Sequence, residues 1–301
     1  MNVDDAYKHC RAIAHKHGAN FSVGFRFLPK RKRRAVYAAY AYCRVADDIA
    51  DEENRVIPSR EDGEGSHADT RKSSPTRLQQ LGEWQAELDR CYAGRPTHPI
   101  TIALADALQH FDIPKSAFVA LIDGCRQDMF KTRYETFDEL LQYCELVAWS
   151  ISDISLAIYG YHTAAALEHG RNLASALQLT NVTRDIGDDL PRDRVYIPQE
   201  ELRRFGVSER DLFARVESPA MRALIEFQID RAESYFKLAE PLLGELSFDA
   251  RFPTVLMGGV YATVLARLRL APFTALRKRL SLSGVQKMMV VARRAVRPHF
   301  V

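Results

Sequence analysis

An acidic stripe along one predicted helix is the feature that most constrains how this chain can fold. The stretch 37–51, YAAYAYCRVADDIAD, has no glycine or proline and is rich in small and apolar residues, so it predicts a helix. Side chains at offsets of zero, four, seven, eight and eleven share one face of such a helix. That face carries Tyr40, Arg44, Asp47, Asp48 and Asp51.

Carboxylates stacked on one helix face repel each other, and burial raises this cost. A divalent cation relieves the repulsion. Mg2+ prefers oxygen ligands, keeps part of its water shell and also takes phosphate oxygens. Arg44 lies about one turn before the first carboxylate, where its guanidinium can contact the same phosphates. The stripe therefore predicts a site for Mg2+ and a phosphorylated substrate, with a solvated acidic helix end as the alternative.

A second acidic stretch begins about 140 residues further along the chain, at 178–189, QLTNVTRDIGDD. Its polar side chains recur every three or four residues and so fall on one helical stripe. They are Gln178, Asn181, Asp185 and the pair Asp188 and Asp189. We expect one continuous helix over 164–189, facing the first acidic helix across a cavity with the metal and a diphosphate at its mouth.

These motifs resemble those of the squalene/phytoene synthase family of head-to-head prenyl transferases. The first stretch, with its CR before the aspartates, is similar to the family's aspartate-rich helix. The stretch 178–198, QLTNVTRDIGDDLPRDRVYIP, matches the second signature of the family, including R-x-Y-x-P. The stretch 143–158, YCELVAWSISDISLAI, resembles the first signature. The likeness runs from about residue 21 to the C-terminus, and RDIGDD with the following RVYIPQEEL looks closest to bacterial phytoene synthases.

The resemblance implies roles for individual side chains. The implied catalytic residues are Arg44, Asp47, Asp51, Asp185 and Asp189. The implied metal-linked residues are Asp47, Asp48, Asp51, Asn181, Asp185 and Asp189. The implied substrate contacts are Tyr40, Tyr143, Gln178, Arg184, Arg194 and Tyr196. An allylic cation needs a dry, apolar cavity, and Phe21 and Val147 are candidates for its lining, with ordinary core positions as the alternative.

The activity implied by the resemblance is the Mg2+-dependent C1'-C1 condensation of two prenyl diphosphates through a cyclopropyl diphosphate, with Mn2+ as the other candidate metal. We expect two geranylgeranyl diphosphates to give phytoene. Squalene or presqualene diphosphate formation from farnesyl diphosphate is the runner-up, and NADPH is needed only for squalene. No glycine-rich dinucleotide fingerprint is present, which favours a reaction without reductant. A non-catalytic family member acting as an assembly scaffold is the alternative of another class.

Two residues depart from the family's first signature. Trp149 stands where a small residue is usual, and Ser152 stands where glycine is usual. We expect Trp149 to shorten or block a prenyl channel, and Ser152 to place a hydroxyl near the carbocation.

A further polar cluster follows the predicted helix at 114–130. Its members are Gln127, Asp128, Arg133 and Tyr134. Asp128 and Arg133 either pair with each other or, as the resemblance implies, lie near the diphosphates.

The fold class predicted for 1–301 is all-α, a single-domain helical bundle around a central cavity of the isoprenoid synthase type. Strand alternation and hairpin turns are absent from the sequence. Helices are expected at 3–17, 100–110, 137–159 and 252–271, the last interrupted by Gly258 and Gly259. A mobile polar loop is expected at about 53–77, where charge, serine, glycine and proline dominate.

The amino-acid composition limits the binding partners and the cellular compartment to be expected for this chain. The net charge of +3 is too small to indicate nucleic acid, and five scattered cysteines indicate free thiols in a reducing compartment. The sequence shows no apolar run long enough to span a membrane, so we expect a cytoplasmic protein that binds prenyl diphosphates. The stretch 285–297 is apolar on one side and basic on the other. It predicts either a helix packed on the domain or peripheral contact with an anionic membrane, and oligomeric state is left open.

Overall fold

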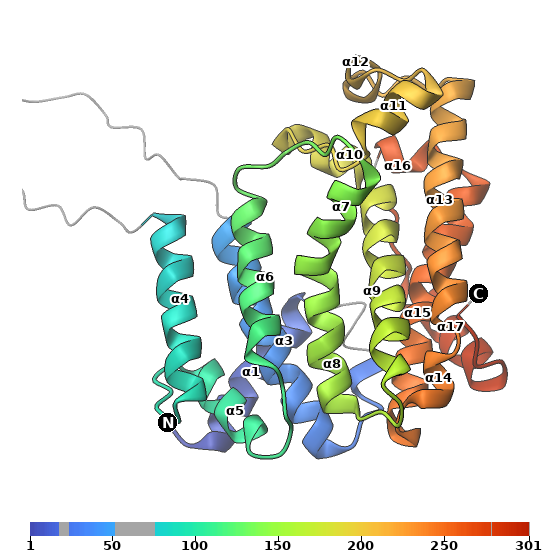
Figure 1. The fold of residues 1–301 in the computed structure, drawn as a ribbon. Helices are drawn as coiled ribbons and strands as arrows, with labels where there is room; N and C mark the ends of the chain where they lie inside the picture. The colour runs from blue at the N-terminus through green and yellow to red at the C-terminus, as the bar shows by residue number, and fades with distance from the viewer. Residues whose placement is uncertain (18–23, 52–75, 278, 301) are drawn as a thin grey trace, which may run out of the picture.

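The computed structural model describes residues 1–17, 24–51, 76–277 and 279–300, and within these ranges the chain is a bundle of helices (Figure 1). The described residues form no strand beyond two isolated β-bridges, Arg133 with Val195 and Tyr161 with Leu246. The predicted all-α class is therefore confirmed.

The longer helices form the body of the bundle. They are α1 (Val3–His17), α3 (Lys30–Asp51), α4 (Arg77–Tyr92), α5 (Pro99–Leu108), α6 (Lys115–Gln127), α7 (Phe137–Cys144), α8 (Ser150–Tyr159), α9 (Ala165–Arg184), α13 (Pro219–Ala239), α15 (Phe248–Leu270) and α17 (Gly284–Val296). Short helices connect them: α10 (Ile186–Asp189), α11 (Gln199–Phe205), α12 (Glu209–Phe213), α14 (Leu242–Glu245) and α16 (Thr274–Arg277), with a π-helix at Glu145–Trp149 and a 3-10 turn at Leu190–Arg192.

Helix α3 runs through the middle of the bundle because its inner face is small. Alanines at 35, 38, 39, 41, 46 and 50 are buried along it, and they let neighbouring helices approach closely. Figure 1 places the C-terminal ends of α3 and α9 at the same end of the bundle. One cluster of buried apolar residues includes members from α1 through α17, as a single domain requires. The organisation of 1–301 as one domain stays a prediction.

Most of the predicted loop at 53–77 lies outside the described residues. Its last two residues belong to α4 instead, because Thr76 is the N-cap and its hydroxyl accepts a hydrogen bond of 3.3 Å from the backbone N–H of Gln79. Arg77 is the first residue of that helix. The loop prediction therefore extended too far toward the C-terminus.

The continuous helix predicted over 164–189 is wrong, because the chain leaves helical geometry at Asp185 (φ −100°, ψ 9°) and restarts as α10. Two threonines precede the break and hydrogen-bond back to the preceding turn. Thr180 Oγ1 donates to the Ala176 carbonyl at 2.6 Å, and Thr183 Oγ1 donates to the Leu179 carbonyl at 2.8 Å. Such back-bonding weakens and bends a helix.

The predicted interruption at Gly258 and Gly259 is also wrong, because α15 passes through both residues without a break. The glycines serve close packing. A Cβ on Gly258 would lie 2.4 Å from the Phe300 ring, and one on Gly259 would lie 2.6 Å from Arg294 Nε. The two glycines thus make room for the C-terminal segment against α15.

Candidate active site

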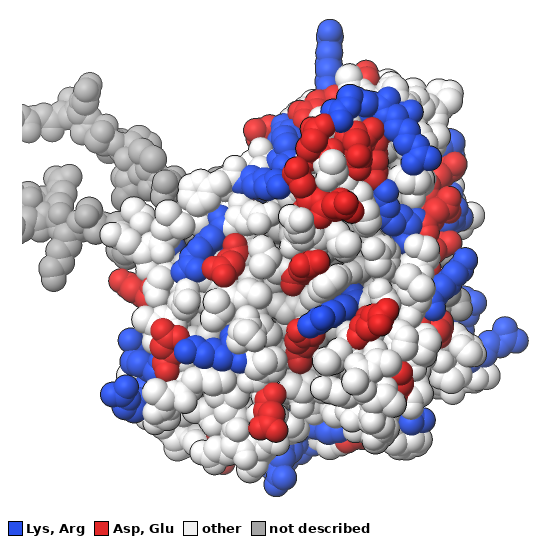
Figure 2. Space-filling view, in the orientation of Figure 1, with Lys and Arg blue, Asp and Glu red and all other residues white. Residues whose placement is uncertain are grey.

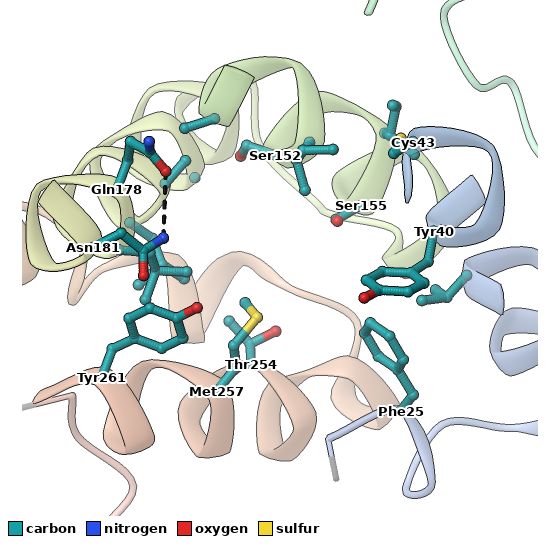
Figure 3. Close-up of a pocket in the computed structure, with 18 of the residues that line it drawn as sticks. Phe25, Tyr40, Cys43, Ser152, Ser155, Gln178, Asn181, Thr254, Met257 and Tyr261 are labelled. Atoms are coloured by element: carbon teal, nitrogen blue, oxygen red, sulfur yellow. Dashed lines mark hydrogen bonds between the residues drawn. The ribbon is translucent and has the colours of Figure 1, made fainter. Parts of the chain in front are cut away.

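A cavity of about 690 Å3 lies between α3, α8, α9 and α15, at the position predicted for it. Most of its lining is apolar. Figure 3 shows Phe25 and Tyr40 on one side of this space, Gln178 and Asn181 on the other, and Met257 between them. The predicted cavity residues Tyr40 and Val147 line it, whereas Phe21 lies outside the described residues.

Asp47 is the carboxylate of α3 that lies in the cavity wall. Burial raises the pKa of its carboxyl to about 7, and the charges of Asp51 and Asp128 add to the shift. The thiol of Cys125 donates a hydrogen bond of 3.4 Å to Asp47 Oδ1. This bond and the charge of Arg44 lower the pKa and so work against the effect of burial. Asp47 is thus a half-buried carboxylate whose ionised form gains from added positive charge.

Arg44 lies one turn before Asp47 on the same wall and forms an ion pair with Asp48. Its Nε is buried and makes no hydrogen bond to any described residue. An unmade bond on a buried guanidinium is costly, so this nitrogen is available for an anion in the cavity.

Arg194 connects the two acidic stretches. It follows the 3-10 turn after α10, and its Nη1 lies 3.3 Å from Asp51 Oδ1 on α3. Arg192 lies 3.8 Å from the other oxygen of Asp51. The charge of Arg194 also lowers the pKa of Asp189, although burial and Asp185 together hold that pKa at about 7. The two stretches therefore meet, although they are far apart in the sequence.

Asp128 lies next to Arg194 and Tyr196, two of the residues predicted for the site, which agrees with the alternative that placed it near the diphosphates. The hydroxyls of Tyr143 and Tyr196 donate to its two carboxylate oxygens at 2.7 and 3.0 Å. Arg194 donates to its backbone carbonyl at 3.3 Å. Burial raises the pKa of Asp128, against the two tyrosine hydrogen bonds.

The alternative that Asp128 pairs with Arg133 is wrong. Arg133 Nη2 lies 2.7 Å from Asp193 Oδ1, and its Nε lies 2.8 Å from Glu209 Oε1. Both partners lie far along the chain, so sequence neighbourhood gave no sign of them.

The second wall of the cavity is the C-terminal part of α9. Gln178, Asn181 and Arg184 line the cavity, and the amide of Asn181 donates to Gln178 Oε1 at 3.4 Å. Arg184 is buried, and its Nε donates to Asp185 Oδ1 at 2.7 Å. Asp188 is exposed, whereas its neighbour Asp189 is half-buried.

Three further polar residues around the cavity were not predicted. Tyr261 lies beside Asn181 (Figure 3), and Arg279 and Lys287 reach the lining from the C-terminal segment. Arg279 Nε lies 3.3 Å from Asp185 Oδ1, and burial lowers the pKa of Lys287. No pattern in the sequence separates these two basic residues from their solvated neighbours.

The two departures from the family's first signature have different outcomes. Ser152 lines the cavity as expected. Trp149 is absent from the lining, and its indole N–H donates to Ser175 Oγ at 2.8 Å, so the expectation that it blocks a channel is wrong. The lining residues Ala148, Ile151, Ser152 and Ser155 recur every three or four residues, so Trp149 falls on another face of the helix.

The residues at the cavity mouth fit a divalent cation in chemistry, although the described residues contain no ready group of three His, Cys, Asp or Glu side chains that would hold one. Burial raises the pKa values of Asp47 and Asp189 to about 7, so both carboxylates gain from a nearby positive charge. Asp47 lies in one wall, and Asp185 pairs with Arg184 of the facing wall. Mg2+ typically takes one or two carboxylates and fills its shell with water and phosphate oxygens.

The fold and the site together define a class of protein. Helices surround a largely apolar cavity that Arg44 and Asp47 line from α3 and Asn181 and Arg184 line from α9, and Arg194 pairs with Asp51 at the end of α3. Charged side chains of both signs crowd the end of the molecule that carries α10, α11 and α12 (Figure 2). This is the architecture of an isoprenoid synthase, and the predicted fold type is confirmed by structural comparison.

Comparison with known proteins identifies the family. The squalene/phytoene synthase profile matches residues 14–286. A 15-cis-phytoene synthase of Synechococcus elongatus is 32% identical over 290 residues, covering 92% of this chain and 88% of that one. A phytoene synthase of Mycobacterium tuberculosis is 33% identical over 293 residues, covering 96% and 90%. The chain belongs to the squalene/phytoene synthase family and is a prenyltransferase, as the sequence motifs predicted.

Two solved structures share the fold. A dehydrosqualene synthase crystallised with a ligand superposes with a TM-score of 0.85 at 25% identity, covering 98% of this chain and 96% of that one. A squalene synthase from Alicyclobacillus acidocaldarius gives a TM-score of 0.78 at 28% identity, covering 89% and 94%.

Proposed function

We propose that this protein condenses two molecules of geranylgeranyl diphosphate head to head to form phytoene, with Mg2+ as the metal. The observation that carries the proposal is the meeting of α3 and α9 at one apolar cavity, with Asp47 on the first wall and Asn181 and Arg184 on the second. The phytoene synthase names of the relatives support the choice of product.

The polar end of the cavity is proposed to bind both diphosphates. Asp47 and Asp51 hold metal on the first wall, and Asn181, Asp185 and Asp189 hold it on the second, with Asp48 orienting Arg44 through their ion pair. When bound, Mg2+ supplies positive charge that stabilises the diphosphate leaving group. Arg44 offers its unpartnered Nε, and Arg194 adds fixed positive charge next to Asp51.

The apolar part of the cavity is proposed to receive the prenyl chains and to exclude water. Breaking the C1–O bond of one diphosphate leaves an allylic cation, which the double bond of the second substrate captures. Loss of a proton from the new cation then closes the three-membered ring of a cyclopropyl diphosphate. A second loss of diphosphate, rearrangement and loss of a proton give the hydrocarbon. Water would quench either cation, and lining residues such as Phe25, Val147 and Met257 keep it out.

Product analysis tests this proposal. The purified chain is incubated with Mg2+ and either geranylgeranyl or farnesyl diphosphate, with and without NADPH, and the extract is analysed by mass spectrometry. A C40 hydrocarbon formed without NADPH is the expected result. A C30 product from farnesyl diphosphate would replace phytoene by squalene or presqualene diphosphate as the product.

A matched pair of variants tests the assigned residues. Asp47→Asn should lose activity because it removes a carboxylate from the cavity wall, whereas Asp188→Asn should keep it because that side chain is exposed. Circular dichroism checks that both variants fold. If the wild-type protein and Asp47→Asn are both folded and both yield no product, the enzymatic proposal fails and a scaffold role takes its place.

A further inference from the structure

Helix α17 presents its apolar stripe to solvent. Val285, Met288, Met289 and Val296 are 71%, 64%, 59% and 81% exposed. Together with exposed Ala292 they recur at offsets of three, four, seven and eleven residues, which places them on a single helix face. In a helix packed on its own domain, this stripe would face the core.

The opposite face of α17 is the one that packs on the domain. Its two buried residues are Val290 and Arg294. Arg294 Nη2 donates to the Phe300 carbonyl at 2.6 Å, and its side chain crosses the backbone of α15 at Gly259. A buried arginine with a specific partner fixes the orientation of the helix, so the apolar stripe cannot turn inward without losing that bond.

The C-terminal segment that carries the stripe is strongly basic. Residues 271–301 contain seven lysines and arginines and no aspartate or glutamate. The chain as a whole has a net charge of +3, so this last segment contributes +7 and the residues before it carry −4. Arg293 and Arg297, both exposed, lie along one side of the stripe. Figure 2 shows Lys and Arg side chains projecting from the edge of the molecule at which Figure 1 places α17.

The same segment also borders the cavity. Arg279, Leu280, Ser281 and Leu282 precede α17 and line the cavity, and Lys287 on α17 lines it as well. The apolar stripe and the substrate space therefore lie on opposite sides of one short stretch of chain.

We propose that α17 is a membrane-docking helix that lies on an anionic lipid bilayer with Val285, Met288, Met289 and Val296 inserted among the acyl chains. Arg293 and Arg297 pair with lipid phosphates. A bilayer is the occupant because it satisfies both an apolar stripe and a basic flank. Two copies of the helix packed antiparallel, stripe to stripe, would instead bring their arginine rows to the same side. No helix among the described residues is long and apolar enough to cross a membrane, so the contact is peripheral. A role of this membrane contact in releasing a hydrocarbon product into the bilayer rests on the proposed function.

Vesicle flotation without substrate tests this surface independently of catalysis. The full chain is mixed with vesicles of phosphatidylcholine alone or with phosphatidylglycerol added, and the floated fraction is measured. We expect binding to the mixed vesicles, reduced about tenfold or more in the variants M288E/M289E and R293Q/R297Q. The matched controls are Leu78→Glu, an exposed apolar residue of α4, and Arg95→Gln, an exposed arginine just after α4. Both should float as the wild type does.

Equal flotation of M288E/M289E and wild type would overturn the proposal, and so would equal binding to vesicles with and without the anionic lipid. Analytical ultracentrifugation without lipid tests the other candidate for this surface, a second copy of the chain. A dimer that M288E/M289E converts to a monomer would assign the stripe to a second copy of the chain. Vesicle binding by a chain that makes no prenyl product would refute the proposed function and leave this surface in place.

Discussion

Replacing Gly187 by alanine should destabilise the protein, because the glycine lies against the backbone of another helix. A Cβ at this position would lie 2.3 Å from the carbonyl oxygen of Leu276 and 2.6 Å from its carbonyl carbon. Both are backbone atoms of α16, so no side-chain rotation relieves the contact. To reach even 3.0 Å, α10 and α16 must separate by about 0.7 Å.

The direction of the change in stability distinguishes Gly187 from a glycine whose replacement by alanine is tolerated. Where an alanine fits, replacing a glycine stabilises a protein by about 0.4–1 kcal/mol, because the unfolded chain loses freedom. Overpacking costs about 1–3 kcal/mol. Gly82 on α4 is the matched control, since its added Cβ would have no atom within 4 Å. We therefore expect Gly187→Ala to lower stability and Gly82→Ala to raise it.

Thermal unfolding followed by circular dichroism measures the difference. At about 2–4 °C per kcal/mol, a cost of about 1–3 kcal/mol for Gly187→Ala should lower Tm by roughly 2–12 °C. Because α16 leads directly to Arg279, which contacts Asp185 at 3.3 Å, the variant should also raise KM for the diphosphate substrate. A Gly187→Ala protein that melts at or above the wild-type temperature would refute the close approach of α10 and α16.

Three further predictions concern other parts of the chain. Asp128→Ala removes the carboxylate to which the hydroxyls of Tyr143 and Tyr196 donate and should cost about 1–3 kcal/mol in urea unfolding; an unchanged midpoint would contradict these contacts. Burial opposes ionisation of Glu87, but hydrogen bonds from Thr101 and other groups lower its pKa from 4.5 to about 2. Since the pKa is lower in the folded state, stability present above pH 4.5 should fall by up to about 3 kcal/mol toward pH 2, and Glu87→Gln should flatten unfolding curves in this window. Trp149→Phe should leave product chain length unchanged in mass spectrometry, because the indole does not line the cavity, whereas a longer product would restore its role as a channel block.

The helices that carry the site were largely predictable from the sequence. Helix α3 was expected because apolar spacing and helix propensity are local properties. The two walls were expected to meet because each carried carboxylates at helical spacing, and Asp47 and Asn181 do lie on one cavity. The family followed from the same motifs, since they combine residue type with spacing.

Residues outside those motifs were placed by packing alone. The sequence left open whether Asp128 pairs with Arg133 or lies near the diphosphates, and only the tertiary structure gives it Tyr143 and Tyr196 as partners. Arg279 reaches the cavity only because the C-terminal segment returns across it. Such contacts join residues far apart in sequence, and no local pattern encodes them.

Helix orientation was the other property decided by the tertiary structure. The sequence determined that residues near 285–297 form an amphipathic helix, but not which face would pack on the domain. Gly258 and Gly259 on α15 open the space in which Phe300 and Arg294 are buried, and this turns the apolar stripe of α17 outward. In the same way, Trp149 donates to Ser175 on α9 and does not line the cavity. Periodicity determines which residues share a face, whereas the direction of that face depends on the partner that packs against it.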